Sequence, residues 1–277
     1  MKILNISPGL LFFALLFSAC EDPIDMDIKQ GNQALIVEGW LTNKAEKHYV
    51  KLYLTKTLDD KNAYEPVTGA TIDLSDDAGN SEVLKEVSAG KYEISSIRGI
   101  EGRTYTLVIE APQGNYQAVS RMPRLSMAPD SLTFKFEEKS IVYDEEGYYP
   151  YIYGQELPGK GDYIQVKLFK NGRYLNHPED INIFSDEFVD GSYINNTELE
   201  VDSAFARGDV VKAEVWSLTE EAYHFWVDMQ TQLRNGGVFA SPLTNTRTNI
   251  RKLNPEAKNV NGFFGTSLVG TTEAKVK

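Results

Sequence analysis

Short stretches in which apolar and polar residues alternate follow one another from residue 34 to residue 121. In residues 49–54 the apolar positions are Val50, Leu52 and Leu54, which a β-strand places on one face. Further stretches with strand patterning are residues 70–74, 90–95, 105–111 and 116–121. About seven short strands at this spacing, separated by turn residues, are typical of a β-sandwich.

Three runs in this first unit carry a further signal. Residues 66–72, 77–80 and 90–92 together resemble the pattern of carboxypeptidase-regulatory-like and transthyretin-like domains. The resemblance implies an immunoglobulin-like or transthyretin-like β-sandwich over residues 34–121. It is a statement about fold and carries no function with it.

Residues 122–129 read as a linker to a second unit over residues 130–277. The linker holds two prolines, which disfavour regular strand pairing and stiffen a connection. Strand patterns resume after it, and Asn171-Gly172 predicts a type I′ hairpin turn. The strand candidates of this second, β-rich domain are residues 131–137, 163–169, 198–201, 210–216 and 262–269.

One segment changes its period from two to 3.6 residues, which predicts an α-helix near residues 219–234. The apolar positions that recur at helical spacing are Ala222, Phe225, Trp226, Met229 and Leu233. Thr219 can cap the helix directly, or Ser217 and Glu220 can form a capping box. We expect the helix to cover one sheet face, with its two adjacent aromatic residues in the core.

The first twenty residues have the features of an exported protein. Lys2 precedes a mostly apolar stretch that is too short to span a bilayer comfortably, and small residues follow it before Cys20. The run 16–20 resembles a bacterial lipobox, although Phe17 stands where Leu is usual. The resemblance implies a signal peptide over residues 1–19, with diacylglycerol and an acyl chain on Cys20. An ordinary secretory signal or a buried N-terminal helix are the alternatives.

The residues after Cys20 form an acidic tether over residues 20–33. Four of the seven residues 21–27 are acidic. Such a run is a solvated segment that anionic headgroups repel. It also resembles the surface-export signal of Bacteroidetes lipoproteins, which implies an outer-membrane location facing the cell exterior.

Composition removes several classes of function. The net charge is −12, which argues against nucleic acid as a partner, because phosphate binding needs a basic face. One Cys and three His leave little for a zinc finger, an iron–sulfur site or a disulfide framework. No cofactor is expected.

Several motifs in order resemble a Bacteroidetes outer-membrane lipoprotein family catalogued as a domain of unknown function, number 4249. They are residues 20–25, 35–42, 66–70, 159–163, 186–191, 239–242 and 261–265. The resemblance covers nearly all of the chain after the leader. It implies a protein often encoded beside a TonB-dependent outer-membrane transporter, and it supplies no catalytic residues.

The chain shows no catalytic constellation. Its histidines, His48, His177 and His224, are far apart in sequence, and the last of them forms an i, i+4 pair with Glu220. Residues 265–269 fail the Gly-x-Ser-x-Gly pattern, and no phosphate-binding loop is present. Any two of the 40 acidic residues can meet in space, so paired carboxylates give no information. We therefore expect no enzymatic activity.

Five tyrosines near three acids form the most suggestive binding candidate. They are Tyr143, Tyr148, Tyr149, Tyr151 and Tyr153. Tyrosine offers a flat apolar face with a polar tip, so a sugar, a peptide or a partner protein could dock there. Tyrosine is also favoured in strands, and simple packing is the alternative.

Two acidic turns offer the oxygen ligands that calcium takes. The first holds Asp76, Asp77 and Asn80, and the second holds Asp186 and Asp190. Neither turn has the twelve-residue EF-hand spacing, and the same residue types are ordinary in turns. We treat both turns as weak calcium candidates.

The sequence thus predicts a non-catalytic, lipid-anchored surface protein that assists a TonB-dependent transporter in ligand capture or uptake. A lipid tether keeps a module close to its partner, so weak affinity suffices. A structural or adhesive surface module is the alternative, and a hydrolase with an unrecognised site is a second one.

Overall fold

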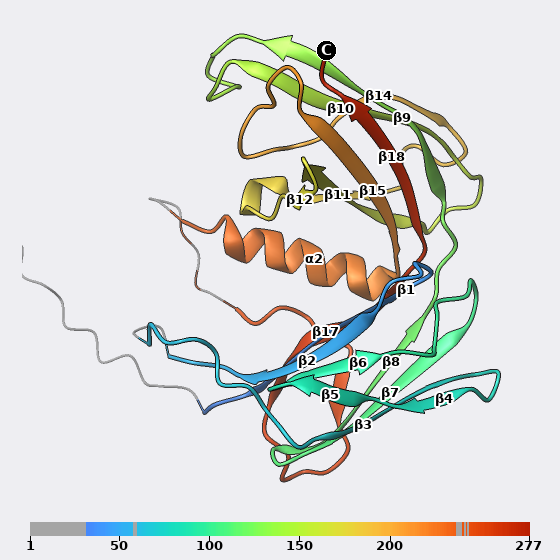
Figure 1. The fold of residues 1–277 in the computed structure, drawn as a ribbon, viewed down its shortest axis with the longest axis vertical. Helices are drawn as coiled ribbons and strands as arrows, with labels where there is room; N and C mark the ends of the chain where they lie inside the picture. Colours follow the sequence, from blue (N-terminus) through green and yellow to red (C-terminus); the bar gives the residue numbers. More distant parts are fainter. Residues whose placement is uncertain (1–31, 58–59, 237–239, 241, 243) are drawn as a thin grey trace, which may run out of the picture. The chain divides into compact units, whose positions relative to one another are not determined.

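A computed structural model describes residues 32–57, 60–236, 240, 242 and 244–277. The predicted signal peptide, Cys20 and the tether up to residue 31 lie outside the described residues. Within the described part the protein is mainly β, as the alternating pattern predicted (Figure 1). None of its described helices is long and apolar enough to cross a membrane.

Two five-stranded sheets enclose the first hydrophobic core. One sheet has the order β17 (Val260–Ser267), β1 (Leu35–Thr42), β2 (His48–Leu54), β6 (Lys91–Ile94) and β5 (Lys85–Ser88). The other has the order β16 (Ile250–Lys252), β8 (Gly114–Arg121), β7 (Thr104–Ala111), β3 (Thr71–Asp76) and β4 (Ser81–Val83). Residues from both sheets join one buried cluster, so the sheets pack face to face as a sandwich.

The alternation in β2 has the predicted consequence. Val50, Leu52 and Leu54 are buried in the core, whereas Tyr49, Lys51 and Tyr53 face away from it. The strand period of two residues separates these sets, because successive side chains point to opposite faces.

Two strands of this sandwich come from the far end of the chain. β17 runs parallel to β1, with Leu35 opposite Val260, and β16 pairs with β8. The expectation that residues 130–277 form a separate unit is wrong for these two strands. Strand patterning shows that a segment extends, but it does not show which distant strand becomes its neighbour.

The remaining strands form the second group of sheets around a second core. One sheet has the order β14 (Tyr193–Glu198), β10 (Gly147–Glu156) and β9 (Met127–Glu137). The other has the order β12 (Arg173–Tyr174), β11 (Tyr163–Lys170), β15 (Val210–Leu218) and β18 (Val269–Lys275), with β13 (Asn182–Ser185) also paired to β11. Since β9 begins at Met127, the connection without strand structure is residues 122–126, shorter than the linker predicted at 122–129.

The predicted type I′ hairpin is confirmed. Asn171 and Gly172 both have positive φ angles, of 51° and 82°, between β11 and β12. This turn needs positive φ at both central positions, which explains the Asn-Gly pair.

Helix α2 (Glu220–Leu233) lies where the two groups of sheets meet (Figure 1). Thr219 is its N-cap, and the Thr219 side chain accepts a hydrogen bond from the backbone N–H of Ala222. The helix contacts β11, β13 and β15 on one side and β17 on the other. It therefore covers more than the single sheet face that the sequence predicted. Phe225 is buried and Trp226 is partly buried. A short 3₁₀ helix, η2 (Pro178–Asp180), precedes β13.

Candidate binding groove and acidic pocket

A half-open groove of about 660 Å³ lies between α2 and the outer face of the first sandwich. We call it the aromatic groove. Its floor is made by the residues of β1 and β2 that alternate away from the core. They are Ile36, Glu38 and Trp40 on β1, and Tyr49, Lys51 and Tyr53 on β2.

The walls of the aromatic groove come from segments far from its floor in sequence. Phe225, Trp226 and Met229 of α2 form one wall, and Phe263 of β17 lies beside them. Lys167 and Tyr174 reach it from the second group of sheets. The groove therefore exists only because α2 and β17 meet at the junction of the two groups of sheets.

The three tryptophans of the chain gather at this junction. The Trp40 ring lies 6.3 Å from that of Trp216 and 6.2 Å from that of Trp226 between centroids. Trp40 donates from Nε1 to Ser267 Oγ at 2.8 Å. Trp226 Nε1 is buried without a hydrogen-bond partner, which is costly for an N–H donor.

The lining of the aromatic groove also includes acidic and basic side chains. Lys51 donates to Glu38 at 2.8 Å, and the Tyr53 hydroxyl donates to the same carboxylate at 3.3 Å. The Lys167 ammonium lies 3.4 Å from the centroid of the Trp216 ring. Burial lowers the pKa of Lys167 to about 7, so its charge changes near neutral pH. The aromatic groove thus offers stacking faces beside hydrogen-bonding groups.

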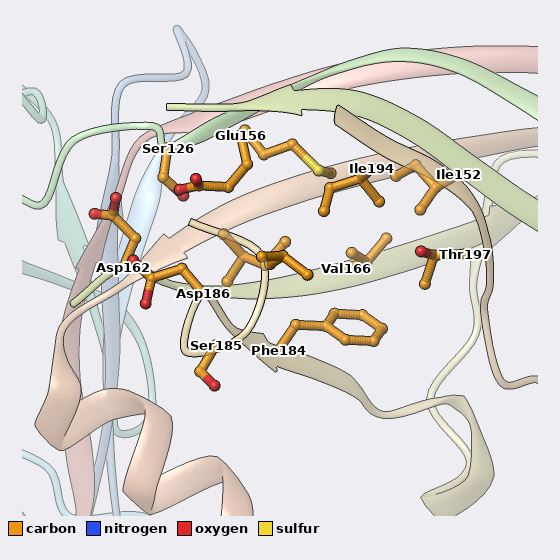
Figure 2. A pocket seen from close by; sticks show the side chains of 13 residues that line it. Ser126, Ile152, Glu156, Asp162, Val166, Phe184, Ser185, Asp186, Ile194 and Thr197 are labelled. Atoms are coloured by element: carbon orange, nitrogen blue, oxygen red, sulfur yellow. The ribbon is translucent and has the colours of Figure 1, made fainter. Parts of the chain in front are cut away.

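A second cavity, of about 200 Å³, lies between the sheets of the second group. We call it the acidic pocket. Figure 2 shows three carboxylates at one end, turned toward one another, and apolar side chains at the other end. Glu156 stands at the end of β10, Asp162 just before β11 and Asp186 just after β13. One oxygen of each lies within 4.8 Å of the other two.

Backbone N–H groups hold two of these carboxylates in place. Glu156 Oε2 accepts from Gly191 N at 2.5 Å, and Asp186 Oδ1 accepts from Gly161 N at 3.1 Å. Their other oxygens, Oε1 and Oδ2, are buried and have no hydrogen-bond partner. Burial raises the pKa of Glu156, and the charges of Asp162 and Asp186 raise it further.

The five predicted tyrosines do not form one surface. Tyr148 packs edge-on against Phe136 on the core side of β10. Tyr149 and Tyr151 point to the other face and are only 7% and 5% exposed. Tyr143 packs against Tyr149 with a tilt of 48° between the rings and 4.5 Å between their centroids.

Their hydroxyls are engaged within the chain. Tyr143 and Tyr151 donate to Glu198, at 3.3 Å and 2.9 Å, and Tyr153 donates to Asn196 at 3.0 Å. None of the five lines the aromatic groove or the acidic pocket. Packing explains most of their surface, and their role in binding stays a prediction.

The first calcium candidate uses its oxygens within the protein. Asp76 accepts from Asn80, from Ala78 N and from Arg103. Burial alone would raise the pKa of Asp76, but these hydrogen bonds prevail and lower it to about 2. Asp77 accepts from the backbone N–H of Thr104.

The second calcium candidate has a different outcome. Asp186 belongs to the acidic pocket, whereas Asp190 accepts from Gly159 N and tethers the neighbouring loop. Sequence reasoning missed Glu156 and Asp162. The run 159–163, which carries Asp162, contributes only to the family resemblance, and no spacing rule connects it to Asp186.

The three histidines lie at separate places. His48 is buried against Thr42, with 2.6 Å between Nε2 and the threonine hydroxyl, and burial lowers its pKa to about 4. His224 faces Glu220 at 3.7 Å as the predicted i, i+4 pair. His177 lies near Asp202 in an exposed group that also includes Glu179.

In its described residues the chain is a mainly β protein with sandwiched sheets and one α-helix at their junction. A family model described as "Domain of unknown function (DUF4249)" matches residues 21–273, and the chain belongs to that family. The predicted membership of the domain family numbered 4249 is confirmed.

Other comparisons are distant. No curated protein matches the chain. Among solved structures, the chain is similar to a biofilm-associated protein, BSP domain, at 13% identity and a TM-score of 0.24, covering 65% of this chain and 27% of that one. A segment of two fibronectin type-III domains from chicken tenascin also matches, at 13% identity and a TM-score of 0.20, covering 66% and 89% of the two chains.

Proposed function

We propose that this protein is a non-catalytic capture module that binds a glycan in the aromatic groove. We further propose that lipid on Cys20 anchors it to the outer membrane, facing the exterior. There it would hold its ligand beside a TonB-dependent transporter. The observation that supports the binding proposal is the aromatic groove itself, with Trp40 on its floor, Trp226 on its wall, and Glu38 and Lys51 among its lining residues.

Glycan chemistry fits this lining. A sugar ring has apolar C–H faces that pack on aromatic rings and hydroxyls that hydrogen-bond at its rim. Lys51, Glu38 and Tyr53 supply such hydrogen-bonding groups on the floor. A peptide that adds to a sheet needs a free strand edge, whereas this floor consists of strand faces.

The anchor is supported by the lipobox resemblance of residues 16–20 and the acidic run after it. Each buried methylene contributes about 0.8 kcal/mol, so several acyl chains hold a protein stably on a membrane. A tethered module stays near its transporter, and weak ligand affinity then suffices for capture.

Tryptophan fluorescence tests the binding site directly, because every tryptophan of the chain lies at the groove junction. We expect an oligosaccharide from a panel to shift the emission of the purified chain with saturation. Tyr53→Ala should weaken that ligand roughly 10-fold or more, since one stacking face is lost. Tyr193→Ala, at an exposed tyrosine outside the groove, is the matched control.

The same titrations separate the alternatives. A peptide that saturates the signal in place of every glycan would contradict the proposed ligand class. Turnover of a bound glycan would favour a hydrolase. Absence of binding by both classes would favour a structural or adhesive module.

The anchor and the partner need tests in cells. We expect protease added to intact cells to degrade the mature chain. Mild detergent extraction should co-purify an outer-membrane transporter, and Cys20→Ala should release the chain from membranes. A protected chain would contradict the exterior location, and a pull-down without any transporter would remove the proposed partner.

A further inference from the structure

We propose that the acidic pocket binds a calcium-like divalent cation through Glu156, Asp162 and Asp186. The site lies in the second group of sheets and shares no lining residue with the aromatic groove. The proposal is therefore independent of the glycan that the groove is proposed to bind.

Three separate chain segments bring the ligands together. Glu156 ends β10, Asp162 leads into β11 and Asp186 follows β13. Their nearest oxygens lie within 4.8 Å of one another, a spacing that a single ion of this kind can bridge with ligand distances of about 2.3–2.6 Å. Figure 2 shows the three carboxylates turned toward a common point.

Two of the ligands carry an oxygen with no partner. Glu156 and Asp186 are 4% and 6% exposed, and their Oε1 and Oδ2 atoms make no hydrogen bond. A buried carboxylate oxygen without a donor is costly, because it has lost its water and gained nothing in return. A cation between these atoms would remove that cost.

The local charge balance also indicates a divalent ion. Arg124 pairs with Asp162, donating from Nη2 to Oδ2 at 2.5 Å and from Nε to both oxygens. Glu156 and Asp186 have no basic side chain among the ion pairs of the described residues. The two negative charges of Glu156 and Asp186 match the charge of one divalent cation. Asp162 accepts hydrogen bonds from Arg124 and still has lone pairs that can bind the ion.

The donor set selects the ion class. All three side chains are carboxylates, and no histidine or cysteine lines the pocket. Oxygen-only sites suit calcium and magnesium rather than zinc or copper. Calcium tolerates irregular geometry, which fits ligands from three separate chain segments, whereas magnesium demands a near-ideal octahedron.

Calorimetric titration of the full chain, purified in detergent and freed of metal with a chelator, tests the site. We expect one calcium to bind with a dissociation constant of about 0.1–1 mM, the range of extracellular calcium modules. Glu156→Gln and Asp186→Asn should each weaken binding at least about 10-fold, because each removes a charged ligand. The matched control is Glu187→Gln, an exposed carboxylate next to Asp186, which should bind as the wild type does.

Thermal unfolding shows whether a variant lost the ion or lost its fold. Calcium at several times the dissociation constant should raise the wild-type Tm by about 3 °C and leave that of Glu156→Gln unchanged. The amide keeps the shape of the side chain, so metal-free Glu156→Gln should melt no lower than the metal-free wild type. Calcium binding that is absent from the wild type, or equal in wild type and Glu156→Gln, would overturn the proposal. A shared proton on Glu156 would then account for the cluster.

Discussion

Glu82 shows how much one carboxylate can hold together. Its Oε1 accepts from the N–H and hydroxyl of Ser95, and its Oε2 accepts from the N–H and hydroxyl of Ser96 and from Ile97 N. Glu82 lies on β4 of one sheet, whereas Ser95 directly follows β6 of the other sheet. Burial alone would raise the pKa of Glu82, but the five hydrogen bonds prevail and lower it to about 2.

A depressed pKa makes this contribution pH-dependent. It is fully present above the unfolded-state pKa, near 4.3, and is lost as the pH falls toward the folded value of about 2. We expect Glu82→Gln to lose about 1–2 kcal/mol of unfolding free energy at neutral pH, after allowance for solvent screening. The gap to the wild type should narrow as the pH falls below about 4.

Urea unfolding at a series of pH values measures that gap. Glu101→Gln, at an exposed carboxylate in the same sandwich, should differ little from the wild type at every pH. If Glu82→Gln loses the same unfolding free energy at every pH down to about 2, the ionised form of Glu82 is not what stabilises its contacts with residues 95–97.

Among the secondary-structure elements, the local sequence was sufficient to predict a turn and a helix, which depend on neighbouring residues. Asn171-Gly172 predicted its turn type, and the spacing from Ala222 to Leu233 predicted α2 to within a residue at each end. Partners across long sequence separations could not be predicted. No local sequence pattern predicts the pairing of β17 with β1 or the contact of Glu156 with Asp186. Each depends on how distant segments of the chain pack together.

A glycine allows β17 to approach β1 closely. Gly262 of β17 has a φ of +93°, and an added Cβ would stand 2.0 Å from the carbonyl oxygen of Val37. Gly262→Ala is therefore strained both in its backbone and against β1, and we expect a loss of about 2 kcal/mol or more in unfolding free energy.

Urea denaturation checks this value against a matched substitution. Gly236 follows α2, has no positive φ and has open space around its Cβ position. Gly236→Ala should change stability by no more than about 0.5 kcal/mol. Equal stability of Gly262→Ala and Gly236→Ala would mean that β1 and β17 move apart to accept the added methyl group without a loss of unfolding free energy.

At the scale of the molecule, the C-terminal strands join the two groups of sheets. A single residue, Leu268, separates β17 in the first sandwich from β18 in the second group. Side chains reinforce the junction: Lys44 donates to Glu214 at 3.0 Å, and Ser267 Oγ donates to Ser217 O at 2.6 Å. The sequence predicted two units joined by a linker, but residues 33–277 form one compact unit.

This connection predicts that the chain unfolds in one step. Tryptophan fluorescence reports the junction, because Trp40, Trp216 and Trp226 belong to β1, β15 and α2, whereas far-UV circular dichroism reports strands throughout. We expect the two urea transitions to coincide, as cooperative two-state unfolding requires. Gly262→Ala should move both midpoints equally without changing the slope of free energy against urea. Two separate transitions, or a fluorescence midpoint that moves alone, would mean that the second group of sheets stays folded after the first has opened.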